Sequence, residues 1–133
     1  MTERLLLAIA LAHVAVGLGL AALPLVPPVH SGLAAMIFGA GRATEEVRFL
    51  LSVFGPTIAS WGILFYALVR AFFRNPSKAS WWALVLSIVI WAPLDSALCA
   101  YYGLYAAIVL NAVVAVVLLG LLISVRRLAY APA

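Results

Sequence analysis

The sequence predicts an all-α integral membrane protein, a four-transmembrane-helix antiparallel bundle with an outward interfacial loop between helices 1 and 2. Of its 133 residues, 68% are hydrophobic and only 9% are charged, whereas a soluble domain is roughly 45–50% apolar and about 25% charged. Four apolar segments each approach or exceed the roughly 20 residues that a helix needs to cross a bilayer. We therefore expect one membrane domain over residues 1–133, with helices at about 5–25, 47–73, 80–102 and 104–125.

The first segment, 5–25, is apolar apart from His13, and the proline-rich stretch that begins at Pro24 ends it. His13, Gly17 and Ala21 are spaced four residues apart, so they share one face of the helix. A stripe of small residues lets two helices approach closely in lipid. We expect this face, including His13, to contact protein.

The connection 26–46 mixes turn formers with a short apolar piece that is too short to span a membrane. It is typical of an interfacial or partly re-entrant segment. Thr44 is expected to cap the second helix, and Glu45 and Glu46 suit its positive N-terminal dipole. In the alternative interpretation, these glutamates or His30 cover the mouth of a cavity between the helices.

The second helix, 47–73, contains Pro56, whose missing N–H removes one intrahelical hydrogen bond and predicts a kink. Gly55, Ala59 and Gly62 form a second stripe of small residues on this helix. A stripe of this kind lets another helix approach closely.

The third segment, 80–102, carries Asp95 well inside an apolar run. A charged side chain at membrane depth costs roughly 3 kcal/mol, so it normally faces protein or a wet cavity and has a partner. The fourth helix, 104–125, has Asn111 as its strongly polar residue. Both lie eight residues from Gly103, in the predicted hairpin turn, which puts them at one level about 12 Å from the turn.

Other polar side chains are expected at a similar depth, and together they form the predicted ligand-binding set. Its members are Asp95, Asn111, His13, Thr57, Ser60 and Trp91. We predict no metal ligands, and no cofactor can be named.

Four interpretations of this set stay open at the level of sequence. Asp95 and Asn111 bond each other and fix the register of two helices. The bundle binds an apolar molecule with one polar end, such as a quinone, isoprenoid, sterol-like lipid or pigment. Asp95 acts as acid or base in a membrane enzyme that isomerises or cyclises such a lipid. The chain is an accessory subunit of a membrane complex, with a membrane protein or a second copy as its partner.

The charges define orientation rather than a nucleic-acid surface, because the eight basic residues lie at the ends of apolar segments. Six of them fall on the side of the two termini and two on the other side, which predicts both termini in the cytoplasm of a bacterial inner membrane. The single cysteine, Cys99, excludes an intrachain disulfide and a cysteine metal cluster.

The outline of the chain resembles the DoxX-like group of small bacterial membrane proteins. The resemblance consists of four short spans, a periplasmic loop after the first, and an arginine seven residues before a glycine at the start of the second, here Arg48 and Gly55. It implies a four-helix bundle, and it transfers no role to any residue.

Overall fold

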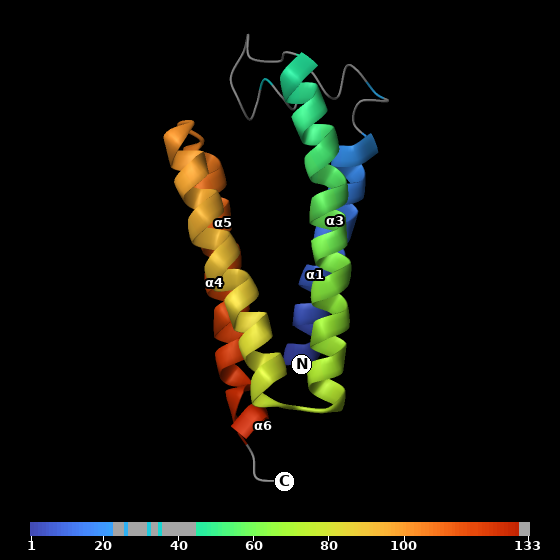
Figure 1. Ribbon diagram of the computed structural model, residues 1–133, viewed down its shortest axis with the longest axis vertical. Helices are drawn as coiled ribbons and strands as arrows, with labels where there is room; N and C mark the ends of the chain where they lie inside the picture. Colours follow the sequence, from blue (N-terminus) through green and yellow to red (C-terminus); the bar gives the residue numbers. More distant parts are fainter. Residues whose placement is uncertain (23–25, 27–31, 33–34, 36–44, 131–133) are drawn as a thin grey trace. The chain divides into compact units, whose positions relative to one another are not determined.

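The computed structural model describes residues 1–22, 26, 32, 35 and 45–130, with the side chains of 45–48 and 51 outside the description (Figure 1). The helices are α1 (Thr2–Ala22), α3 (Glu45–Arg74), α4 (Lys78–Tyr101), α5 (Tyr105–Ser124) and α6 (Arg126–Tyr130). α1, α4, α5 and the Ser52–Arg74 part of α3 are long and apolar enough to cross a membrane. The all-α class with four spans is confirmed.

The predicted interfacial loop, with His30 and the Thr44 cap, lies outside the described residues, as do the side chains of Glu45 and Glu46. The remaining chain falls into two units by its internal contacts. One is Ile9–Leu64, and the other is Met1–Ala8 with Phe65–Ala133. Each is described by itself.

In the unit Ile9–Leu64, α1 and α3 meet along the two stripes of small residues. A Cβ atom added at Gly17 would lie 2.5 Å from the carbonyl oxygen of Gly55 and 2.9 Å from Cα of Ala59. A Cβ at Gly62 would lie 2.8 Å from the carbonyl oxygen of Ala10. These positions therefore need glycine because backbone lies directly against backbone, which confirms the close approach predicted from the stripes.

The helix α3 is continuous through Pro56 and ends at Arg74. Just after the proline, Thr57 Oγ1 donates a 3.2 Å hydrogen bond to the carbonyl oxygen of Val53, one turn back. A threonine hydroxyl bonded in this way has no need of a distant partner in the apolar phase. The kink inferred from Pro56 stays a prediction.

In the second unit, α4 and α5 form an antiparallel hairpin, drawn side by side in Figure 1. Ser77 caps α4, because its hydroxyl oxygen accepts a 3.1 Å hydrogen bond from the backbone N–H of Ser80. The turn between the helices includes Gly103 at φ +71°, a left-handed conformation that glycine adopts without steric cost. The hairpin predicted around this glycine is confirmed.

The buried positions of the hairpin recur every three or four residues along α4 and every four or seven along α5, which is the spacing of one helix face against another. They are Trp81, Leu84, Ile88 and Ala92 on α4 and Asn111, Leu118 and Leu122 on α5. At the end remote from the turn, Trp81 Nε1 donates a 2.9 Å hydrogen bond to the carbonyl oxygen of Leu122. The bond joins the start of α4 to the end of α5.

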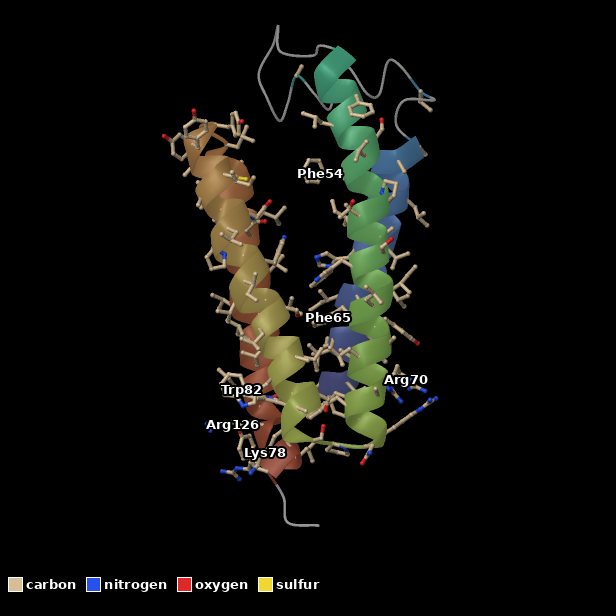
Figure 2. The ribbon with its side chains drawn as sticks, in the orientation of Figure 1. Phe54, Phe65, Arg70, Lys78, Trp82 and Arg126 are labelled. Carbon is tan, nitrogen blue, oxygen red and sulfur yellow. The ribbon has the colours of Figure 1, made fainter. Side chains whose placement is uncertain are left out.

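Three basic residues of this unit, Arg70, Lys78 and Arg126, lie toward the end where α4 begins (Figure 2). The short helix α6 packs there against α4 and α5. Arg70 Nη1 makes a 3.2 Å ion pair with Glu3 Oε1. Both side chains are more than a third exposed, so the pair contributes at most about 1 kcal/mol.

Candidate functional site

The polar centre of the hairpin is the pair Asp95 and Asn111. Asn111 Nδ2 donates a hydrogen bond to Asp95 Oδ2 at 2.5 Å, which joins α4 to α5 within the membrane spans. Asn111 is 7% exposed, and Asp95 is partly buried. The two side chains therefore lie at the same depth, as predicted. The bond between them, expected in the first interpretation, is present.

The register of the hairpin accounts for this pairing. Asp95 and Asn111 lie equally far from Gly103, and Trp81 and Leu122 lie 22 and 19 residues from it. The two interhelical hydrogen bonds thus agree on one alignment to within a helical turn. These two bonds, 14 residues apart on α4, fix the register of α4 against α5.

The pair leaves hydrogen-bonding capacity unused. Asp95 Oδ2 accepts from Asn111 and, weakly at 3.9 Å, from the thiol of Cys99. Within the described part of the chain, Asp95 Oδ1, the amide oxygen of Asn111 and one of its N–H groups have no protein partner. In an apolar phase such groups are costly unless something bonds them.

Exposed aliphatic side chains adjoin the pair. Leu94 and Leu98 on α4 are 62% and 61% exposed, and Leu110 on α5, next to Asn111, is 63% exposed. The polar pair is therefore set into an apolar surface. Trp91 lies one turn before Asp95 on α4 and is partly buried.

His13, Thr57 and Ser60 belong to the other unit. His13 Nδ1 donates a 2.8 Å hydrogen bond to the carbonyl oxygen of Ile9, since a carbonyl can only accept. Its ring lies 4.8 Å from the ring of Trp61, between centroids, across the contact of α1 with α3. The expectation that His13 faces protein is confirmed, while Ser60 is exposed and Thr57 bonds its own helix.

The structure thus brings together two groups: Asp95 with Asn111 and Cys99, and His13 with Trp61. Binding of a ligand by any member of the predicted set stays a prediction. The predicted set does not include Trp61, although the two stripes of small residues contain the signal for its contact with His13. Once Gly17 is aligned with Gly55 and Ala59, a residue one turn earlier on α1 must meet one slightly later on α3.

A second group that sequence reasoning missed lies where α4 begins and the chain leaves α5. There Lys78 and Arg126 approach the aromatic rings of Trp81 and Tyr130. Its signal in the sequence was the pair of Tyr130 and Arg126 at a spacing of one helical turn. Within the described residues, no group of three or more histidine, cysteine or acidic side chains could hold a metal ion.

These features define a small multi-pass membrane protein of four spans with a polar pair in one helical hairpin. Comparison with protein-family models, curated proteins and solved structures finds no match to this chain.

Proposed function

We propose that the protein binds an apolar, lipid-like molecule by one hydroxyl-bearing end at the Asp95–Asn111 pair. The observation that supports this function is the capacity left over by the pair: a carboxyl oxygen, an amide oxygen and an amide N–H. A hydroxyl group both donates and accepts hydrogen bonds, so it complements such a set.

The surroundings suit the rest of such a molecule. Leu94 and Leu98, near Asp95 in the sequence, and Leu110, next to Asn111, expose aliphatic surface, which fits an acyl or isoprenoid tail. An isoprenoid alcohol, a quinol or a sterol-like lipid combines a tail of this kind with one hydroxyl-bearing end. The proposal concerns binding, and turnover of the bound molecule is the alternative in which Asp95 acts as acid or base.

One argument for an accessory subunit was that the stripes of small residues could pack on a partner, and this argument is weakened. The two stripes of small residues were candidates for packing on a partner, but Gly17, Gly55 and Gly62 are already covered by neighbouring helices of this chain. An accessory role would have to use the exposed apolar side chains of the helices, which occur on α1, α3, α4 and α5.

The proposal includes the location of the protein in a bacterial inner membrane with both termini in the cytoplasm. The gathering of Arg70, Lys78 and Arg126 at one end of their unit supports this orientation (Figure 2), since positive residues remain on the cytoplasmic side. A DoxX-like relationship agrees with the four spans and adds no residue role.

A ligand pair that differs only in its hydroxyl group tests the function. Purified protein in detergent is titrated with geranylgeraniol and with its methyl ether, which has lost the donor, and binding is followed by tryptophan fluorescence. We expect the wild type to bind the alcohol about tenfold more tightly, because hydrogen bonds to a carboxylate are worth about 1.5–3 kcal/mol. Asp95→Asn should remove most of this preference and leave the binding of the ether unchanged.

The control is Ser87→Ala, which removes a hydroxyl on the same helix that is bonded to the carbonyl oxygen of Leu84. This variant should keep the preference for the alcohol. Equal binding of alcohol and ether by the wild type, or an unchanged preference in Asp95→Asn, would leave the pair with only its helix-joining role.

A further inference from the structure

A cluster of cations and aromatic rings lies where α4 begins and α6 follows α5. We call it the cation–aromatic cluster, and its members are Lys78, Trp81, Arg126, Arg127 and Tyr130. Lys78 is the first residue of one span, and Ser124, just before α6, is the last residue of another. The cluster therefore lies at the level where apolar helices reach the lipid headgroups.

Two cations of the cluster share one aromatic ring. Lys78 Nζ lies 5.0 Å from the centroid of the Tyr130 ring, and Arg126 Cζ lies 5.1 Å from the same centroid. Arg126 Cζ is also 5.7 Å from the Trp81 ring, which is itself fixed by its hydrogen bond to Leu122. All three separations are within the range of cation–π attraction, so the rings hold the two charges near each other.

No carboxylate balances these charges in the described part of the chain. Of the acidic side chains described, Glu3 pairs with Arg70 and Asp95 bonds Asn111. Lys78, Arg126 and Arg127 make no ion pair with either of them. Like charges gathered without a counter-charge repel one another, and a bound anion would relieve this repulsion.

The surface beside the cluster is hollowed and apolar at its edge. A shallow hollow is lined by Ile123, Arg126, Arg127 and Tyr130. Ile123, in the last turn of α5, is 64% exposed, and Trp82, beside Trp81, is 46% exposed. A ligand here meets positive charge on one side and apolar surface on the membrane side.

We infer that the cation–aromatic cluster binds the phosphodiester headgroup of an anionic phospholipid. Lys78, Arg126 and Arg127 neutralise the phosphate, and the acyl chains follow the exposed apolar surface near Ile123. Arginine and lysine near a membrane surface each attract anionic lipid, and the rings add a fixed arrangement to that attraction. This site is separate from the Asp95–Asn111 pair and does not depend on its function.

The test compares two phospholipids that share their acyl chains. Dioleoyl phosphatidylglycerol or dioleoyl phosphatidylcholine is added to the detergent-solubilised full chain, and bound lipid is counted by native mass spectrometry while thermal unfolding is recorded. The wild type should bind phosphatidylglycerol in preference and unfold at a higher temperature in its presence. The double variant Lys78→Gln with Arg126→Gln should bind phosphatidylglycerol at least about tenfold more weakly.

A double variant with the same loss of charge, Arg4→Gln with Arg74→Gln, is the matched control and should bind within about twofold of the wild type. Tyr130→Leu keeps every cation and removes the shared ring, so it should show a clear partial loss. Equal losses in the two double variants would mean that the overall positive charge of the protein attracts the lipid, and would overturn the site. Unchanged binding in Tyr130→Leu would overturn it as well. Competition by millimolar inorganic phosphate as strong as that by the lipid would show a free-phosphate site and overturn the lipid assignment.

Discussion

The substitution Gly17→Ala adds one methyl group at the contact of α1 with α3, where the structure leaves no space for it. The new Cβ would lie 2.5 Å from the carbonyl oxygen of Gly55 and 2.9 Å from Cα of Ala59. Both neighbours are backbone atoms, which cannot swing away as the end of a flexible side chain can. The two helices must therefore separate, and the contacts along the stripes weaken together.

The magnitude follows from a comparison with Gly19, two residues later on the same helix. A Cβ at Gly19 meets nothing within 4 Å. Both alanines gain the same helix propensity, about 0.5–1 kcal/mol, and only Gly17→Ala adds overpacking, which costs about 1–3 kcal/mol. We expect Gly17→Ala to be less stable than Gly19→Ala by about 1–3 kcal/mol.

Unfolding of the purified variants by sodium dodecyl sulfate in mixed micelles, followed by circular dichroism, measures this difference. The wild type should lie between the two variants or close to Gly19→Ala. If Gly17→Ala were as stable as Gly19→Ala, the backbone-to-backbone contact of α1 with α3 would be wrong.

Two other predictions concern the hairpin and the orientation. Trp81→Phe keeps a buried aromatic ring but removes the indole N–H that bonds the carbonyl oxygen of Leu122 and leaves space in the core. Unfolding should therefore become easier by at least about 1 kcal/mol. Trp82→Phe, on the exposed neighbour, should change little, and equal effects would mean that neither the bond nor the buried ring adds stability. Cysteines placed at Ser31 and Ser77 in a Cys99→Ala background should react with an impermeant maleimide from opposite sides of the membrane, Ser31 from outside intact cells, and labelling of Ser77 from outside would reverse the orientation.

The sequence by itself was sufficient for the class of protein and for the number of spans. Runs of about 20 apolar residues admit only helices across a bilayer, because every backbone N–H and C=O must be bonded within its own segment. That Asp95 and Asn111 lie at the same depth was also predictable, because both are eight residues from Gly103 in an antiparallel hairpin. The two stripes of small residues were visible as helix faces from their spacing of three and four residues, but their contact with each other came from the structure.

Only the tertiary structure decided what each polar side chain bonds. Thr57 and His13 each donate a hydrogen bond to a carbonyl of their own helix, one turn back. Periodicity gives the face of a residue and its depth, but the partner of a side chain depends on rotamers and on the separation of neighbouring helices, which no spacing rule contains. For the same reason, the sharing of Tyr130 by Lys78 and Arg126 became visible only when α6 was seen packed against the start of α4.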